Sequence, residues 1–259
     1  MGLVGFAWGL QRGEKMRKAW YHLEGSKKAE LWTILHLPYT LMCIAFLAVG
    51  FAIHKPVNWE LFGAAILAYF LGLGLAAHAF DQLSLTGSRY VKYLTRRELL
   101  AIGISSLITA IAIGVFYMVK YSLWHLIWLI PLQAIFAIGY PIGETFRGKL
   151  HNDISFSFSF GALPPLVGFY VNTGELSLVV LPFMVLCGLV AYIEILLSRQ
   201  CRRLRKELRE GIIRMGDLVF TPRKDSIPAI YRDLIEKPEK ALKVLCLLSY
   251  VLPFCLFVF

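Results

Sequence analysis

Long runs of apolar residues recur along the chain, separated by shorter polar connections. A helix needs about 20 apolar residues to cross the hydrocarbon core of a bilayer. The runs that approach or meet that length are 32–53, 59–80, 99–119, 123–142, 154–171, 176–197 and 241–259. Formal charges inside them are confined to Glu60, Glu194 and Lys243. The pattern predicts an all-α polytopic membrane bundle of about seven transmembrane helices, because a helix satisfies its own backbone hydrogen bonds in lipid.

Composition supports a membrane protein over a soluble one. Apolar residues make up 58% of the chain and charged residues only 17%, outside the range of ordinary soluble domains. A β-barrel would need short segments of alternating polarity, and the sequence has none. The five cysteines are scattered without paired spacing, which argues against a disulfide framework or a zinc site.

The formal net charge of +10 is distributed in a way that predicts orientation. With the N-terminus in the cytoplasm, nearly all basic residues outside the spans fall in the cytoplasmic segments 1–31, 82–98, 143–153 and 199–240. Only Lys55 and Lys120 fall in the opposite connections. This follows the positive-inside rule and places the chain in the cell (plasma) membrane with its elaborated face in the cytoplasm. The basic surplus then serves topology and contact with anionic membrane lipids, and nucleic acid is not expected as a partner.

The same pattern divides the chain into four parts. Residues 1–31 form a basic interfacial segment, 32–198 a bundle of six spans, 199–240 a basic cytoplasmic segment and 241–259 a final span. Within 199–240, Leu204, Leu208 and Ile212 have helical spacing. This spacing is typical of an amphipathic helix lying on the membrane surface; a solvated connector is an equally good interpretation.

Polar and ionisable residues gather at the cytoplasmic ends of several spans: His78, Asp81, Tyr140, Arg147, Lys149, Asn152, Asp153, Glu194 and Arg199. Such groups at a membrane boundary are costly unless paired or hydrated, and they often mark function. Taken singly, Asp81 can be a solvated helix-end carboxylate, Glu194 a partner of a neighbouring arginine and His78 a packed ring. Their convergence on one face favours a shared site.

Carboxylates together with arginine and lysine suit a polyphosphate bound through magnesium. If that phosphate belongs to a prenyl diphosphate, the cations stabilise the departing diphosphate while an allylic carbocation develops. The carbocation needs a dry, aromatic cavity. Phe156, Phe158 and Phe160 follow Asp153, but alternate helical positions do not share a face, so only some of them can line one cavity.

Three segments resemble the UbiA superfamily of intramembrane prenyltransferases. AHAFDQL looks like the family's first aspartate-rich motif, NxxxDxxxD, with Asp81 on the middle aspartate. YPIGETFRGKLHND looks like its Tyr-Pro…Lys-Arg segment, which carries Tyr140 and Arg147, and LHLPYTL looks like its first-span signature, with matches at Pro38 and Thr40. The resemblance covers roughly residues 30–200.

The resemblance implies a UbiA-like bundle with a central cavity open to the cytoplasm. Its activity would be transfer of an isoprenoid from a prenyl diphosphate to a hydrophobic acceptor, an aromatic ring or a lipid alcohol, with Mg²⁺ assisting ionisation. By the resemblance, Asp81, Tyr140 and Arg147 belong to the site. Together with the polar cluster described above, we expect Asp81, Asp153 and Tyr140 to be catalytic, with Asp81 and Asp153 on the metal. The expected substrate-binding residues are His78, Arg147, Lys149, Asn152, Glu194 and Arg199.

The chain also departs from the family pattern. In the first aspartate-rich motif, Ala77 stands in place of the asparagine and Leu85 in place of the last aspartate. In the first-span signature, Leu37 replaces the arginine. The second aspartate-rich motif has no equivalent in this chain. One magnesium held mainly by Asp81, with arginine and lysine replacing a second metal, is therefore the expected form of the site. The alternative is a relative that has lost the chemistry and binds a lipid or quinone, or serves as a subunit of a homo-oligomer or membrane complex. A CDP-alcohol phosphotransferase and a transporter are less favoured.

Overall fold

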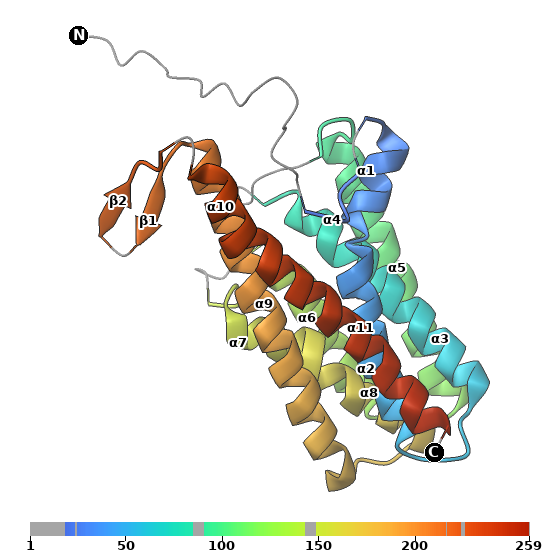
Figure 1. Ribbon diagram of the computed structural model, residues 1–259. Helices are drawn as coiled ribbons and strands as arrows, with labels where there is room; N and C mark the ends of the chain where they lie inside the picture. Colours follow the sequence, from blue (N-terminus) through green and yellow to red (C-terminus); the bar gives the residue numbers. More distant parts are fainter. Residues whose placement is uncertain are drawn as a thin grey trace. The chain divides into compact units, whose positions relative to one another are not determined.

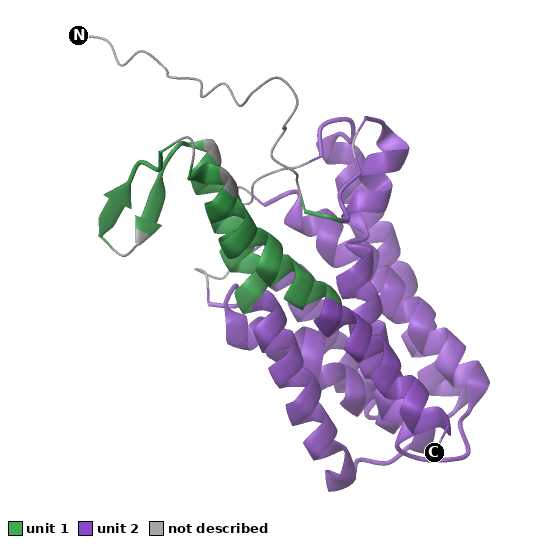
Figure 2. Ribbon diagram, in the orientation of Figure 1, with its two compact units in different colours: residues 1–20, 196–243 green, residues 21–195, 244–259 purple. Residues whose placement is uncertain are grey.

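The computed structural model describes residues 19–23, 25–84, 91–142, 149–215, 217–223 and 226–258. Of the chain, 76% is helical. It divides into two compact units (Figure 2): residues 21–195 and 244–259, which we call the bundle, and residues 1–20 and 196–243, which we call the basic unit. Each is described by itself.

The bundle is built from helices (Figure 1). In chain order they are α1 (Lys27–Ile34), α2 (Leu37–Ala52), α3 (Trp59–Tyr69), the π-helix η1 (Phe70–Ala76), α4 (Ala77–Asp81), α5 (Arg96–Lys120), α6 (Leu126–Gly139), α7 (Asp153–Phe156), the π-helix η2 (Ser157–Ala162), α8 (Leu163–Thr173), the 3₁₀-helix η3 (Leu178–Val180), α9 (Leu181–Arg209) and α11 (Lys237–Val258). The last two helices also extend into the basic unit.

Six helical stretches are long and apolar enough to cross a membrane. They are Lys27–Ala52, Trp59–Asp81, Arg96–Lys120, Asp153–Thr173, Leu178–Leu208 and Ala229–Val258. The remaining expected span corresponds to α6, which is apolar but only 14 residues long. The expectation of a helical chain with helices able to cross a membrane is confirmed, and the count becomes six long helices and one shorter one among the described residues.

Helix α2 occupies the core of the bundle and packs along α8. A Cβ atom added at Gly50 would overlap the Pro165 carbonyl oxygen and lie 2.6 Å from the Phe169 amide nitrogen. A Cβ atom added at Gly168 would likewise overlap the Leu47 carbonyl oxygen. The two backbones therefore touch, as at the small-residue interfaces that join helices in membranes.

Asn172, near the end of α8, ties that helix to the connection between α2 and α3. Its Nδ2 donates to the carbonyl oxygens of Phe51, at 3.3 Å, and His54, at 2.8 Å. Its Oδ1 accepts from the Asn58 amide at 2.9 Å. The side chain thus satisfies backbone groups that the helix ends leave open.

Glu30 performs a similar task at the opposite end of the bundle. This carboxylate is only 4% exposed and accepts hydrogen bonds from three consecutive backbone amides, those of Lys92, Tyr93 and Leu94. Thr95 then caps α5 in a capping box with Glu98. A buried carboxylate thereby organises the chain that enters α5.

The basic unit contains a small fold that hydropathy does not predict. Strands β1 (Ile213–Met215) and β2 (Leu218–Phe220) pair antiparallel, with Ile213 opposite Phe220. They are followed by α10 (Ile227–Tyr231) and the π-helix η4 (Arg232–Glu236). Leu204 and Leu208 are buried in a cluster with Ile213 and Ile235. The 199–240 segment is therefore not one continuous amphipathic helix: the helix ends at Arg209, and Ile212 lies beyond it.

We expect Gly50→Ala to destabilise the bundle by about 1–3 kcal/mol, because the methyl group forces α2 away from α8. Gly63→Ala is the matched control, since nothing lies within 4 Å of a Cβ atom at that helical position. The control should be neutral or stabilising by up to about 1 kcal/mol. Thermal unfolding in detergent or nanodiscs measures both, and equal melting temperatures for the two variants would contradict the packing described.

We expect Glu30→Gln to increase the exchange rates of the amide protons of residues 92–94 by about tenfold, because hydrogen bonds to a charged acceptor are stronger than those to a neutral one. Hydrogen exchange followed by mass spectrometry reports on this segment directly. Glu175→Gln, at an exposed position, should leave the rates unchanged. Unaltered exchange in Glu30→Gln would show that the carboxylate does not hold the segment.

Candidate functional site

Two spans that carry predicted site residues change to π-helical geometry near those residues. η1 ends at Ala76, two residues before His78, and η2 begins at Ser157, four residues after Asp153. π-helical turns interrupt the regular hydrogen-bond ladder and often occur at functional sites. Each contains a glycine against a neighbouring helix: Gly74 faces Thr40 of α2, and Gly161 faces Cys187 of α9.

His78 lies in a group of rings at one end of the bundle. Its imidazole stacks on His36, with centroids 4.3 Å apart and planes 30° apart. Tyr21, His22 and Tyr39 complete the group, which we call the histidine cluster. The ring centroids of Tyr21 and His22 lie 5.1 Å and 5.8 Å from that of His36. The ring centroid of Tyr39 lies 5.4 Å from that of Tyr21. The cluster joins the segment before α1, the start of α2 and helix α4.

His36 adopts a backbone conformation that is unusual for a residue with a side chain. Its φ is 42°, in the left-handed region, which costs roughly 1–3 kcal/mol in a residue other than glycine. The reversal separates α1 from α2, and Thr40 Oγ1 supports it by donating to the Leu35 carbonyl oxygen at 2.6 Å. Strain of this kind tends to persist where it positions a functional side chain, and here it turns the imidazole onto His78.

Asp81 is the last residue of α4, three positions after His78, and is partly exposed. Its Oδ2 accepts from Gln82 Nε2 at 3.1 Å. The carboxylate therefore stands at the rim of the bundle, within reach of water.

A second group of rings surrounds Tyr140 at the end of α6. His151 stacks on Tyr140 with centroids 4.8 Å apart, and its Nδ1 lies 2.8 Å from the Tyr140 carbonyl oxygen. Phe156 and Phe160 stack on one another at 4.8 Å, and both contact Tyr140. We call these four residues the tyrosine cluster. Phe158, in contrast, is 39% exposed.

The polar residues next to the tyrosine cluster start helix α7. Asn152 is its N-cap: Oδ1 accepts from the Ser155 amide at 2.8 Å, and Nδ2 donates to the Lys149 carbonyl oxygen at 2.6 Å. Asp153 is the first residue of the helix and is half-buried, while Lys149 is exposed. Asn152 therefore has a structural role in addition to any binding role.

Glu194 is deeply buried, with 2% exposure, on the face of α9 that also carries Cys187 and Ala191. Those two residues pack in an apolar cluster with Met42, Phe46 and Cys246. Tyr39 of the histidine cluster and Phe156 of the tyrosine cluster both pack against it. The apolar cluster thus links the two groups of rings, and Glu194 lies on the helix face turned towards it.

The remaining predicted residues are placed differently. Arg147 lies outside the described residues, and Arg199 belongs to the basic unit. Within the described ranges, no group of three or more His, Cys, Asp or Glu side chains is arranged to hold a metal ion. The roles assigned to the nine residues from sequence remain predictions.

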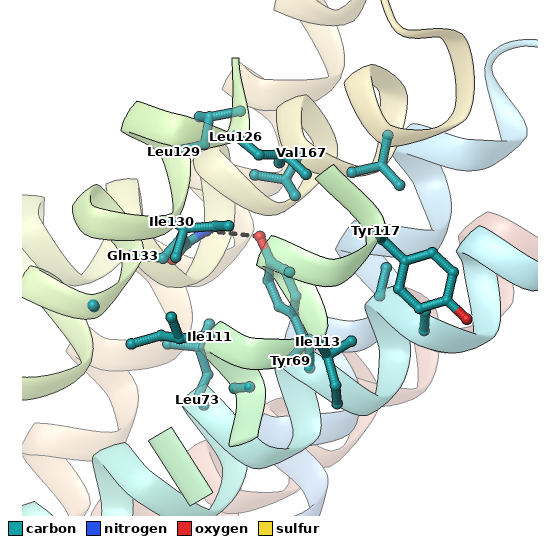
Figure 3. Close-up of a pocket in the computed structure, with 18 of the residues that line it drawn as sticks. Tyr69, Leu73, Ile111, Ile113, Tyr117, Leu126, Leu129, Ile130, Gln133 and Val167 are labelled. Carbon is teal, nitrogen blue, oxygen red and sulfur yellow. Dashed lines mark hydrogen bonds between the residues drawn. The ribbon is translucent and has the colours of Figure 1, made fainter. Parts of the chain in front are cut away.

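A pocket lies elsewhere in the bundle, between α3, η1, α5, α6 and α8 (Figure 3). None of the predicted site residues lines it. Its polar side chains are Tyr117 and the pair Tyr69 and Gln133, which is joined by a hydrogen bond of 2.7 Å from Gln133 Nε2 to the Tyr69 hydroxyl. Sequence reasoning missed both residues, although a glutamine within the apolar run 123–142 is a signal that could have drawn attention.

No protein-family model, curated protein or solved structure matches the chain. The chain is mostly helical, and six helices among its described residues are long and apolar enough to cross a membrane.

We expect His36→Asn to be more stable than His36→Val, because asparagine adopts the left-handed conformation readily whereas a β-branched residue is strained there. Both variants lose the stacked imidazole, so the difference between their unfolding temperatures isolates the backbone strain. The same pair of substitutions at the exposed, helical Gln200 provides the reference for helix propensity. A valine variant at least as stable as the asparagine variant would contradict the strained reversal.

Proposed function

We propose that the chain is an intramembrane prenyltransferase, similar to the UbiA superfamily. It moves an isoprenoid from a prenyl diphosphate to an aromatic or lipid-alcohol acceptor at the cytoplasmic face of the plasma membrane. The observation that carries the proposal is the joining of the histidine and tyrosine clusters through the apolar cluster beside Glu194. These two clusters contain His78 and Tyr140, predicted site residues from separate spans, and a ring of each cluster packs against the same apolar residues.

The proposed site begins at the rim with Asp81. Mg²⁺ takes one or two carboxylates and completes its coordination with water and phosphate oxygens, and a partly exposed aspartate at a helix end suits that requirement. Asp81 would hold the ion, with Asp153 as a second ligand or as the base that accepts the acceptor's proton. When bound, the ion offsets charge on the departing diphosphate.

Basic and hydrogen-bonding side chains surround the diphosphate in this proposal. Arg147 and Lys149 neutralise its charge, while the substrate-binding role predicted for Arg199 stays a prediction from sequence. Asn152 and His78 donate hydrogen bonds to its oxygens, and Glu194 orients the basic groups. Fixed donors aimed at developing charge lower the barrier to ionisation because they need little reorganisation during the reaction.

The tyrosine cluster provides the environment that an allylic carbocation requires. Tyr140, Phe156 and Phe160 present ring faces in a region from which water is largely excluded, since Tyr140 is 9% and Phe160 8% exposed. Aromatic faces attract cations, and the lack of water protects the intermediate from hydrolysis. Tyr140 also orients the substrate through its hydroxyl.

We expect purified protein in nanodiscs to release diphosphate from a prenyl diphosphate in the presence of Mg²⁺ and an acceptor. Asp81→Asn should reduce the rate by at least about a hundredfold, because the amide cannot replace a charged ligand. Release of diphosphate, measured over prenyl chains of several lengths and a panel of acceptors, is the readout. Glu175→Asn, at an exposed carboxylate remote from the site, should retain full activity.

The outcome of that comparison separates the proposal from its competitors. Full activity in a folded Asp81→Asn protein would remove Asp81 from the site. Loss of activity together with a lowered unfolding temperature would indicate a structural role instead, and an Asp81→Glu variant that regains part of the rate would restore the metal-ligand assignment.

A second candidate function is binding without chemistry: a membrane protein that holds a lipid or quinone, or serves as a subunit of a membrane complex. Ala77 in place of the motif's asparagine favours this candidate, because a buried alanine contributes no ligand. Absence of diphosphate release from the whole panel, accompanied by saturable binding of a quinone, would select it.

A further inference from the structure

The pocket of Figure 3 is formed where small residues face one another across the helices. Ala68 of α3, Gly72 of η1, Ala110 and Gly114 of α5, and Ala134 of α6 all line it. The cavity volume is about 120 Å³. An engineered apolar cavity of about 150 Å³ takes up benzene, so the pocket has the size of a single ring.

The wall of this pocket carries a polar pair with unused hydrogen-bonding capacity. Gln133 Nε2 donates to the Tyr69 hydroxyl, and Gln133 Oε1 is buried and accepts from no group in the described part of the chain. Tyr69 itself is 8% exposed. A buried polar atom without a partner is destabilising, and lipid offers it no water as a substitute. Such an atom beside a cavity points to a ligand that satisfies it.

The pair specifies the chemistry of that ligand. A hydroxyl group can donate to Gln133 Oε1 and accept from the Tyr69 hydroxyl at the same time. If the amide is turned by 180°, the Tyr69 hydroxyl donates to Gln133 Oε1, and the Nε2 hydrogens have no acceptor. The hydroxyl of the ligand then accepts a hydrogen bond from Nε2. A hydroxyl therefore fits either orientation of the amide.

The other available occupants fit less well. An acyl chain fills apolar space but brings no donor or acceptor to Gln133. One water molecule occupies about 30 Å³ and would leave most of the 120 Å³ cavity unfilled. A ring bearing a hydroxyl satisfies both the volume and the polar pair.

We propose that this pocket binds a membrane-soluble ring compound with a hydroxyl group, of the phenol or quinol class. The ring lies among Ala68, Ala110 and Ala134, and the hydroxyl lies on the Tyr69–Gln133 pair. The inference goes beyond prenyl transfer and does not depend on it, because the pocket shares no residue with the proposed reaction site.

The test compares 4-propylphenol with propylbenzene, two probes that differ only in the hydroxyl, for binding to the full-length protein in nanodiscs. Equilibrium dialysis with empty nanodiscs as reference corrects for partition into lipid. We expect the protein to bind the phenol about tenfold more tightly than propylbenzene, as one well-formed hydrogen bond to a buried group provides.

Gln133→Met keeps the size of the side chain but removes both polar atoms, and it should abolish the preference for the phenol while leaving propylbenzene binding unchanged. Gln200→Met, at an exposed glutamine, is the matched control and should retain the preference. Ala134→Leu, which fills the cavity, should remove binding of both probes. Tyr69→Phe provides a second route to the same result if Gln133→Met does not fold.

Three results would overturn the inference. Equal affinity of the wild-type protein for the two probes would show that the pocket does not recognise the hydroxyl and is an apolar cavity suited to an acyl chain. No saturable binding of either probe would remove the site. A preference for the phenol that persists in both folded Gln133→Met and folded Tyr69→Phe would place the hydroxyl elsewhere. None of these results bears on diphosphate release, so failure here is distinguishable from failure of the proposed prenyl transfer.

Discussion

The bundle depends on direct contact between the backbones of α2 and α8. Gly50 and Gly168 leave no room for a side chain, so the helices meet at their main-chain atoms. In lipid the hydrophobic effect does little to join helices, and close van der Waals packing with interhelical hydrogen bonds takes its place. Asn172 supplies hydrogen bonds at one end of the contact. This packing keeps α2 buried, whereas the outer faces of α5 and α9 carry exposed apolar residues suited to lipid.

Placing α2 in the core also determines what surrounds its beginning. The chain reverses at His36 with a left-handed backbone, and Gly74 of the π-helix η1 allows that segment to approach Thr40. His78 then stacks on His36. Two local departures from regular helical geometry therefore create the histidine cluster, and with it the placement of Asp81 one turn further along α4.

The bundle separates two kinds of chemistry. The region that carries His78, Tyr140 and Glu194 combines rings with ionisable groups. The pocket at Tyr69 and Gln133 is mostly apolar, with this polar pair and Tyr117 in its wall. Polar atoms are costly in lipid unless they have a purpose or a partner. That cost is the physical reason for attaching significance to both regions.

The sequence by itself determined the helices, because crossing a bilayer demands apolar length, which is a local property. The apolar run 59–80 corresponds to the helical stretch Trp59–Asp81, and the run 154–171 corresponds to Asp153–Thr173, so the predicted and observed ends differ by at most two residues. Hydropathy did not predict the paired strands at 213–220, the short α6 or the π-helical turns, since apolar length does not determine strand pairing or the hydrogen-bond pattern within a helix. Only the tertiary structure decided that Gly50 meets Pro165 and that Gln133 reaches Tyr69. Facing residues on separate helices leave no periodic signal in either helix alone, so their chemistry became visible only once the helices were packed.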